Sequence, residues 1–180
     1  MEIEQTGLKD CIIIKPRVFD DPRGYFFESF NKQTFEDKTG LSGEFVQDNQ
    51  SYSSYGVIRG LHAQTGAFAQ AKLVRVTKGE VLDVAVDARP GSPTYGQHVA
   101  VRLSAENKLQ LYIPRGFVHG FSVLSETAEF LYKCDNFFNK ASETGVIYND
   151  ADLNIDWMIP ESDASVSEKD LILNAFSSLK

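Results

Sequence analysis

Cysteine is scarce in this chain of 180 residues, and the little there is shows no metal-binding or disulfide pattern. The two cysteines, Cys11 and Cys134, are far apart in sequence, and no Cys-x-x-Cys pair occurs. A disulfide-rich secreted scaffold is therefore excluded. Two small buried thiols are the simplest interpretation, and they suit the reducing environment of the cytoplasm.

Long apolar runs and the common cofactor motifs are also missing. The first five residues are acidic and polar, unlike a signal peptide, and no apolar run approaches the length needed to cross a membrane. No Gly-rich loop indicates a nicotinamide or ATP site, and no serine or cysteine sits in a nucleophile motif for acyl transfer. We therefore expect a cytoplasmic protein with no membrane partner and no cofactor.

Histidine is rare, and its spacing does not favour a metal site. The three histidines, His62, His98 and His119, are widely spread, and none forms a His-x-His pair. His98 lies on the face of its strand opposite Val99, where we expect it to meet solvent. The sequence therefore predicts no metal site.

The charge balance is acidic, with a net charge of −7. Such a surface disfavours non-specific binding to DNA or RNA, so we expect no nucleic-acid partner. An anionic ligand would need a local basic cluster set against this field. Hydrophobic residues make up 42% of the chain. The length suffices for one domain, residues 1–180, with a large core.

Short β-branched and aromatic runs separated by turn sequences dominate the chain, and they predict many short strands. Turns recur about every 8–12 residues, which is typical of an antiparallel sandwich or jelly-roll barrel. Residues 31–38 predict a helix capped by Asn31 and ended at Gly40, and residues 165–173 predict a loop followed by a short helix. We expect a mainly β protein with a barrel core at about 45–135, onto which N-terminal strands and a C-terminal tail pack. The predicted strands span residues 11–14, 25–30, 45–49, 72–76, 81–86, 99–103, 109–113, 117–124 and 129–134.

Alternation along these strands places four polar side chains on apolar faces: Lys72, Asp83, His119 and Tyr132. Burying such groups costs free energy unless they find partners, so several on neighbouring strands suggest a pocket inside the barrel. In the run Val57-Ile58-Arg59-Gly60-Leu61-His62, strict alternation would put Arg59 and His62 on opposite faces. A bulge at Gly60 would turn both inward.

The residue types that gather here indicate a proton-transfer chemistry. Taken singly, His62, Lys72 and Tyr132 could each be structural. Together they supply a base near neutral pH, a fixed cation and a phenol, which suit proton abstraction next to a carbonyl followed by reprotonation.

Blocks of sequence from about Ile12 to Asp170 carry a family resemblance. They include Phe45-Val46-Gln47-Asp48-Asn49, Arg59-Gly60-Leu61-His62, Lys72-Leu73-Val74-Arg75, Asp83-Val84-Ala85-Val86-Asp87, His119-Gly120-Phe121 and Glu129-Phe130-Leu131-Tyr132-Lys133. In this order they resemble the dTDP-4-dehydrorhamnose 3,5-epimerases. The resemblance implies a cupin-like jelly roll, a homodimer and no cofactor. It also implies conversion of dTDP-4-dehydro-6-deoxy-glucose to dTDP-4-dehydro-rhamnose, an isomerase step in dTDP-rhamnose biosynthesis for cell-envelope polysaccharide.

The resemblance also implies roles for individual residues. His62 would be the base, oriented by Asp170, while Tyr132 would be the acid on the opposite face and Lys72 would stabilise the enolate. Asp83 would be a partner for His119. The residues implied to bind substrate are Arg23, Glu28, Gln47, Asn49, Arg59, Lys72, His119, Glu143 and Lys169.

Two departures from the family pattern affect substrate detail. Ala63 follows the histidine where the family commonly has an aromatic residue, and we expect it to open space beside the base. Phe137-Phe138 stands where the family commonly has a Tyr-Tyr pair, so hydroxyls near the nucleotide or phosphate would be lost.

Other functions remain open at this point. A related sugar-nucleotide 3-epimerase or 3,4-ketoisomerase would use the same barrel. A metal-dependent cupin is disfavoured by the absent His-x-His pair. A non-catalytic nucleotide-sugar-binding module is disfavoured by the presence of His62, Asp170, Tyr132 and Lys72 together.

Overall fold

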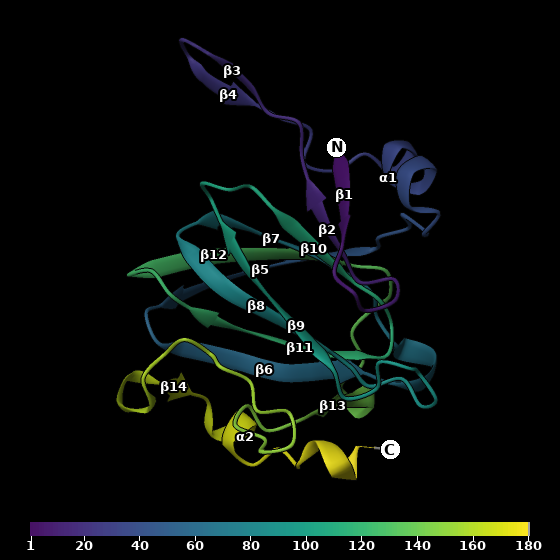
Figure 1. The fold of residues 1–180 in the computed structure, drawn as a ribbon, viewed down its shortest axis with the longest axis vertical. Coiled ribbons are helices and arrows are strands. Elements are labelled where there is room, and N and C mark those ends of the chain that lie inside the picture. Colours follow the sequence, from purple (N-terminus) through teal and green to yellow (C-terminus); the bar gives the residue numbers. More distant parts are fainter. Residues whose placement is uncertain (180) are drawn as a thin grey trace.

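Two antiparallel sheets face one another in the computed structural model, which describes residues 1–179 (Figure 1). The first sheet has the order β1 (Glu2–Gln5), β2 (Ile12–Lys15), β10 (Gln110–Ile113), β7 (Lys72–Lys78), β12 (Thr127–Cys134) and β5 (Gln47–Ser54). The second has the order β13 (Glu143–Gly145), β6 (Val57–Gln64), β11 (Phe117–Val123), β8 (Glu80–Asp87) and β9 (His98–Ser104). A short strand, β14 (Ser165–Val166), adds to β6 in parallel. The predicted mainly β, jelly-roll architecture is confirmed.

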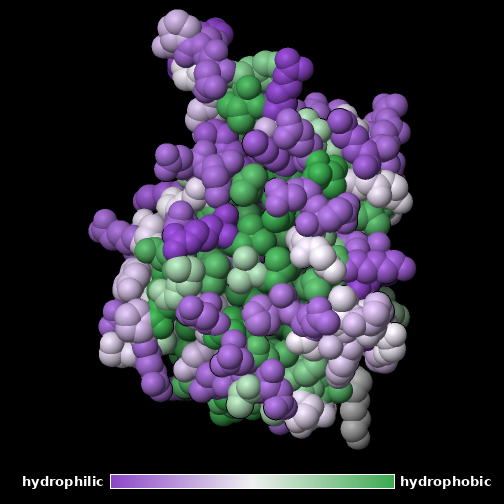
Figure 2. Space-filling model, in the orientation of Figure 1, coloured by the Kyte–Doolittle hydropathy of each residue, from purple (hydrophilic) through white to green (hydrophobic). Residues whose placement is uncertain are grey.

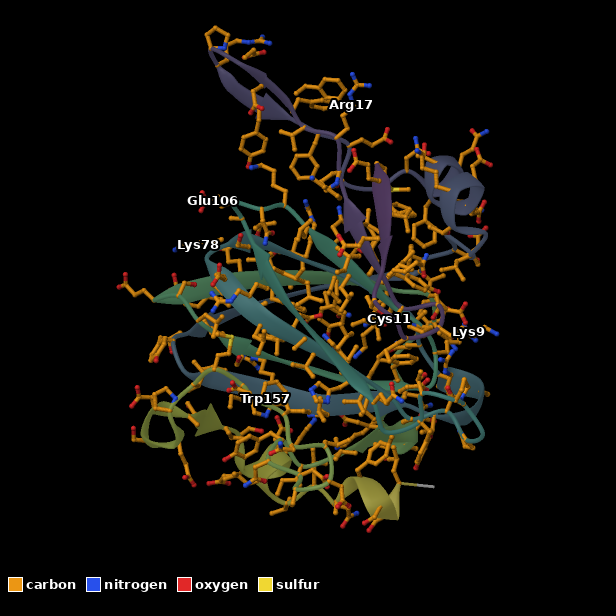
Figure 3. The ribbon with its side chains drawn as sticks, viewed as in Figure 1. Lys9, Cys11, Arg17, Lys78, Glu106 and Trp157 are labelled. Carbon is orange, nitrogen blue, oxygen red and sulfur yellow. The ribbon has the colours of Figure 1, made fainter. Side chains whose placement is uncertain are left out.

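The space between the sheets is filled by the inward side chains of both. The cluster includes Val74, Val81, Leu103, Phe121 and Phe130, all at most 5% exposed. A second cluster lies on the outer side of β6, β8 and β11, where the C-terminal tail covers these strands. Trp157 (Figure 3) and Phe176 are its large aromatic members from the tail. Because apolar burial stabilises both faces of this sheet, its strands are almost continuously buried, as β11 and β8 show.

Helix α1 (Lys32–Thr39) forms where its capping residues predict it. The Asn31 side chain accepts a hydrogen bond from the Thr34 backbone N–H, and Gly40 ends the helix in the left-handed conformation. Phe35 is buried against Tyr112 on the first sheet. The remaining helical elements are α2 (Glu168–Leu171) and single turns at Gly66–Phe68, Lys140–Ser142, Glu161–Asp163 and Phe176–Ser178.

Three local predictions need correction. The strand expected at 45–49 begins at Gln47 and continues to Ser54, because its polar residues alternate between solvent and the space between the sheets. The strand expected at 25–30 is limited to β4 (Gly24–Phe26), which pairs with β3 (Phe19–Asp21). His98 is half-buried rather than solvent-facing, and burial lowers the pKa of its imidazole.

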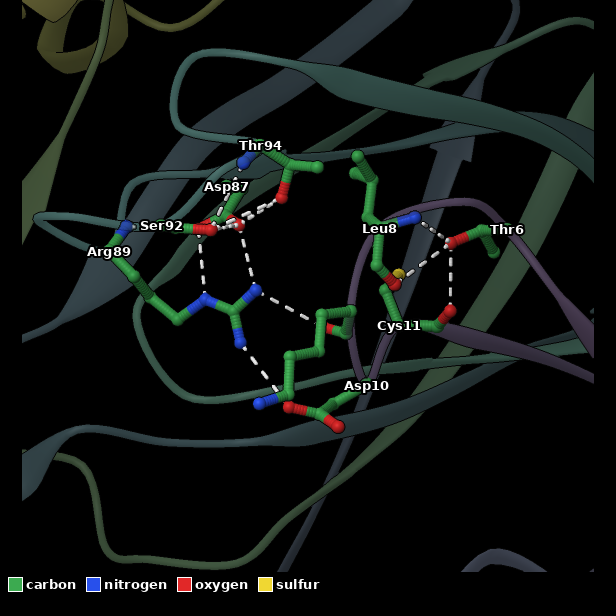
Figure 4. Close-up of polar contacts among 9 residues, drawn as sticks. Thr6, Leu8, Asp10, Cys11, Asp87, Arg89, Ser92 and Thr94 are labelled. Atoms are coloured by element: carbon green, nitrogen blue, oxygen red, sulfur yellow. Dashed lines mark hydrogen bonds and ion pairs between the residues drawn. The ribbon is translucent and has the colours of Figure 1, made fainter.

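A buried carboxylate, Asp87, lies at the end of β8 within a cluster of polar contacts (Figure 4). Asp87 is fully buried and accepts hydrogen bonds from the side chains of Arg89, Ser92 and Thr94. Burial alone would raise the pKa of Asp87, but these donors outweigh it and hold the pKa well below its usual range. Arg89 also bonds Asp10 and so ties the N-terminal segment to this end.

The hairpin of β3 and β4 forms an arm that projects from the barrel (Figure 1). Its aromatic side chains lie in solvent, with Phe19, Tyr25 and Phe26 at least half exposed. Apolar side chains gather near the arm among hydrophilic ones (Figure 2). Exposed aromatic residues on an arm of this kind are typical of a surface that is covered by a partner.

No helix within residues 1–179 has both the length and the apolar character that a membrane crossing requires.

The predicted bulge at Gly60 is present in β6. His119 lies opposite His62 and Phe121 lies opposite Arg59, so β6 has one extra residue between the two pairs. Gly60 has a φ of +119°, and a Cβ atom there would lie 2.6 Å from the Cα of Gly120. Only glycine permits both this backbone conformation and this close approach of β6 to β11.

We predict that Gly60→Ala destabilises the protein by about 3 kcal/mol, because positive φ and a backbone clash act together. Gly24→Ala is the matched control. Gly24 has a φ of +130° with no heavy atom near its added Cβ, so this variant should lose only about 1 kcal/mol. Urea unfolding of both variants measures the difference. Equal losses would show that the approach of β6 to Gly120 contributes nothing.

Candidate active site

A cavity of about 730 Å³ opens between the two sheets. Nine of the residues singled out by sequence line it, although they come from seven elements or the loops beside them. They are Asn49, Arg59, His62, Lys72, His119, Tyr132, Glu143, Lys169 and Asp170. The fold therefore gathers residues separated by more than a hundred positions around one volume.

His62 and Asp170 form a hydrogen-bonded pair at this cavity. The distance between His62 Nε2 and Asp170 Oδ1 is 2.7 Å. The Asp170 side chain is only 4% exposed, whereas that of His62 remains accessible at 28%. A buried carboxylate fixes the orientation of an imidazole and stabilises its protonated form, so His62 has the surroundings of a general base.

The C-terminal tail delivers Asp170 to His62. Strand β14 pairs with Ile58 and Val57 of β6, and α2 follows directly. Ser167 caps this short helix by accepting the Asp170 N–H. The second Asp170 oxygen accepts the backbone N–H of Gly60 at 3.4 Å. The bulge in β6 and the tail thus hold the pair from both sides.

Lys72 and Tyr132 lie on the first sheet, across the cavity from β6. The Lys72 Nζ is 5.7 Å from the centre of the Tyr132 ring, a distance at which a cation is attracted by the ring face. Burial lowers the pKa of Lys72, an effect opposed by Cys134, Asp83 and Glu143. Burial also raises the pKa of Tyr132, with Cys134 adding to the rise and Arg59 opposing it. Tyr132 therefore stays a protonated phenol that can donate.

A second imidazole–carboxylate pair lies deeper in the barrel. His119 Nε2 is 2.8 Å from Asp83 Oδ1, and the two side chains are 6% and 0% exposed. Burial lowers the pKa of His119, and the charge and hydrogen bond of Asp83 only partly oppose it. The His119 ring packs against Phe130 with the ring centres 6.0 Å apart. His119 is thereby held rigidly at the cavity wall.

Polar side chains at the rim include one charged pair and several serines that were not predicted from the sequence. Arg59 Nε donates to Ser53 Oγ at 3.1 Å across the two sheets, and Lys169 Nζ bonds Glu143 Oε1 at 2.7 Å. Ser51, Ser165 and Ser167 also line the cavity. Alternation along β5 beyond Asn49 is the signal that could have found Ser51 and Ser53.

Three of the expected substrate-binding residues lie outside this cavity. Arg23 is on the exposed arm, where its side chain is 90% exposed and bonds Asp21. Glu28 lines a separate cavity of about 310 Å³ beside α1. Gln47 lies behind Asn49 and does not line the cavity. Its side chain donates a hydrogen bond to Asn49 Oδ1 and accepts one from the Phe138 backbone N–H.

The two departures from the family pattern have different positions. Ala63 packs into the outer cluster beneath the C-terminal tail, so the expectation that it opens space beside the base is wrong. It points away from the cavity because it follows the inward-facing His62 on β6. Phe137 and Phe138 are 61% and 53% exposed. Their loop is held by Gln47 and by Gln64, which accepts the Asn139 N–H.

Within residues 1–179, no three His, Cys, Asp or Glu side chains are grouped so that they could hold a metal ion. A base at His62, a phenol at Tyr132 and an ammonium at Lys72 can remove a proton beside a carbonyl, hold the enolate and return a proton.

Comparison with known proteins gives a consistent result. The family model described as dTDP-4-dehydrorhamnose 3,5-epimerase matches residues 5–178. The chain is 54% identical to the dTDP-4-dehydrorhamnose 3,5-epimerase of Pseudomonas aeruginosa over 178 residues, 98% of this chain and 97% of the relative.

Solved structures agree with the sequence comparison. The crystal structure of dTDP-4-dehydrorhamnose 3,5-epimerase from Elizabethkingia anophelis NUHP1 has a TM-score of 0.96 and 60% identity, covering 100% of this chain and 99% of that one. The epimerase from Legionella pneumophila Philadelphia 1, crystallised with dTDP-4-keto-L-rhamnose, has a TM-score of 0.95 and 46% identity, covering 99% and 94%.

Proposed function

The chain belongs to the dTDP-4-dehydrorhamnose 3,5-epimerase family, and we propose that it epimerises C3 and C5 of dTDP-4-dehydro-6-deoxy-glucose to give dTDP-4-dehydro-rhamnose. One observation carries this proposal. The His62–Asp170 pair, Lys72 and Tyr132 all line a single cavity between the sheets. The reaction is an isomerisation in dTDP-rhamnose biosynthesis, and its catalytic groups are side chains of the protein.

His62 is the base in this proposal. The C4 ketone acidifies the protons on both C3 and C5, so one base in one cavity can address the two carbons in turn. Asp170 holds the imidazole in place and stabilises the imidazolium that each abstraction creates, since it is buried and only 2.7 Å away.

Lys72 stabilises the enolate oxygen at C4. A fixed positive charge in a cavity that excludes most water stabilises a developing anion far more than the same charge in bulk solvent. The Lys72 side chain is held against Tyr132 rather than extended into solvent. Its charge is therefore in place before the enolate forms.

Tyr132 returns the proton on the opposite face. Inversion requires one proton to leave one face of the ring and another to arrive on the other. His62 belongs to β6 and Tyr132 to β12, which lie in the two facing sheets. The raised pKa of Tyr132, caused chiefly by burial, keeps the phenol protonated and suits it to donate to an enolate rather than to act as a base.

The remaining polar residues bind the sugar and nucleotide parts of the substrate around the reacting carbons. Arg59 and Lys169 bring positive charge to the rim, where a diphosphate needs it despite the net negative charge of the chain. Asn49, His119 and Glu143 offer further polar contacts, and Gln47 supports Asn49 from behind. Cys11 and Cys134 are free and buried, which agrees with a cytoplasmic enzyme.

A homodimer accounts for Arg23 and Glu28. Neither lies in the cavity of its own chain, yet the arm that carries Arg23 presents exposed Phe19 and Phe26. We propose that a second copy covers this arm, and that the arm places Arg23, with Glu28 near its base, at the cavity of the partner. Exposed aromatic and Arg side chains are the residue types enriched at such interfaces.

The purified protein is expected to incorporate deuterium at C3 and C5 when it converts dTDP-4-dehydro-6-deoxy-glucose in heavy water, as followed by NMR of the product. His62→Ala should lower turnover by about 10²–10⁴, the usual contribution of a positioned base. Its substrate dissociation constant should change far less. Label at C3 alone would identify a 3-epimerase instead, and near-normal turnover of His62→Ala would remove the base from the mechanism.

For Tyr132→Phe, we expect isotope exchange into the substrate to outpace formation of epimer. His62 still forms the enolate and can return a deuteron to the same face, whereas the acid on the other face is missing. The substitution keeps the ring beside Phe130. An exchange-to-inversion ratio equal to that of the wild type would reject the acid role of Tyr132 and leave the role of His62 untouched.

Mixing two inactive variants should restore activity if the arm acts across a dimer. In a mixed dimer of Arg23→Glu and His62→Ala, one cavity receives both intact residues and the other receives neither. Turnover should recover to roughly a quarter of wild type, because half of the dimers are mixed and one of their two sites is intact. The two variants kept apart are the controls. No recovery, with dimers confirmed by sedimentation, would place Arg23 outside the partner's site.

A further inference from the structure

Asp83 is a carboxylate with no exposed surface, and it is only half satisfied. Its Oδ1 receives a hydrogen bond from His119 Nε2 at 2.8 Å, while no side chain or backbone group within residues 1–179 bonds its Oδ2. A buried charge with a free oxygen is costly unless a positive charge lies near enough to compensate. A positive charge near Asp83, even beyond hydrogen-bonding distance, would offset this cost.

Within residues 1–179, Lys72 is a cation that lacks a hydrogen-bonding partner, as Asp83 Oδ2 does. Among the described residues, its Nζ forms no ion pair and no hydrogen bond, although it lies inside the cavity. Burial lowers the pKa of Lys72, and three groups oppose this: Cys134, Asp83 and Glu143. An ammonium in such a site needs at least one nearby negative charge to stay protonated.

Two of the three groups are poor sources of that charge. Burial raises the pKa of the Cys134 thiol to about 11, so it is uncharged near neutral pH. Glu143 already forms an ion pair with Lys169 at 2.7 Å. Asp83 is left as the carboxylate whose charge is not matched by a partner at hydrogen-bonding distance. The other titratable or charged groups around Lys72 are Arg59, His62, His119, Tyr132, Lys169 and Asp170.

We propose that Asp83, already bonded to His119, is also a positioning residue for the epimerase reaction through Lys72: its buried charge keeps Lys72 in the ammonium form. This inference rests on the proposed function only in giving the Lys72 ammonium a reaction to serve. The relation between Asp83 and Lys72 can be tested in the ligand-free protein.

The same arrangement defines what His119 can recognise. Its Nε2–H donates to Asp83, so Nδ1 is the ring nitrogen left for a ligand. Burial lowers the His119 pKa, and the charge and hydrogen bond of Asp83 only partly oppose it, while Lys72 and His62 lower the pKa further, which keeps the ring neutral. A neutral Nδ1 accepts hydrogen bonds, so His119 recognises a sugar hydroxyl, and the ketone oxygen is left to Lys72.

The decisive variant is Asp83→Asn, because an amide oxygen can still accept from His119 while the charge is removed. The Lys72 ε-carbon is followed by ¹³C NMR across pH in the ligand-free protein, with its signal assigned from Lys72→Met. We expect the Lys72 titration to move down by about one pH unit. The ¹⁵N shifts of His119 should keep the Nε2–H tautomer in both proteins.

Asp87→Asn is the matched control. Asp87 lies on the same strand and is equally buried, but its partners are Arg89, Ser92 and Thr94 at the barrel end. This variant should lose stability through those bonds, while its Lys72 titration should equal that of the wild type. An unchanged Lys72 titration in Asp83→Asn would overturn the proposal.

A kinetic measurement separates this inference from the activity itself. A lysine is charged below its pKa, so the alkaline limb of turnover should fall about one pH unit earlier in Asp83→Asn. If the protein has no epimerase activity, the NMR titration still decides the proposal. Should Asp83→Asn fail to fold, the ¹³Cγ signal of Asp83 in the wild type reports whether the carboxyl is ionised. A protonated Asp83 carboxyl at neutral pH would also overturn the proposal.

Discussion

The close contact between Gly60 of β6 and Gly120 of β11 is the constraint on which the site depends. A Cβ on Gly60 would lie 2.6 Å from the Cα of Gly120, and a Cβ on Gly120 would lie 2.6 Å from the backbone oxygen of Arg59. The missing side chains let β6 carry an extra residue without leaving the sheet. That extra residue turns both Arg59 and His62 toward the cavity, and it exposes the Gly60 N–H to Asp170.

Assembly of the His62–Asp170 pair then depends on a segment outside the barrel. The tail from β13 to its end packs Trp157 and Phe176 on the outer side of the second sheet, and β14 continues that sheet beyond β6. Apolar burial of this kind supplies the free energy that holds α2 in place. A four-residue helix would not persist alone, so the orientation of Asp170 is a product of tail packing.

The interior of the barrel places its charges between apolar layers. Lys72 of the first sheet and His119 of the second line the cavity, and Val74, Phe121 and Phe130 are buried in the core beside them. Asp83 is buried behind His119, to which it is hydrogen-bonded. Removing water from these groups lowers the pKa values of Lys72 and His119 and raises that of Tyr132. A base, a neutral hydrogen-bond acceptor and a protonated phenol can therefore act at one pH within one cavity.

Much of this could be predicted from the residues in order. Alternation placed Lys72, Asp83, His119 and Tyr132 on inner faces, and capping residues located α1, because both signals are local and depend on a few neighbouring positions. The bulge at Gly60 could be predicted because strict alternation would place Arg59 and His62 on opposite faces of the strand.

Tertiary structure decided what local signals do not contain. The polar strand β5 continues to Ser54 because it pairs along its length with β12, which no hydrophobic pattern in its own residues indicates. Ala63 faces the tail rather than the cavity, and Asp170 reaches a histidine 108 positions away, because both depend on how the tail packs. The arm that bears Arg23 lies apart from the cavity of the same chain, because the chain leaves the barrel before it forms β3 and β4 (Figure 1). The sequence alone thus determined which residue types face inward, while long-range packing determined which of them meet.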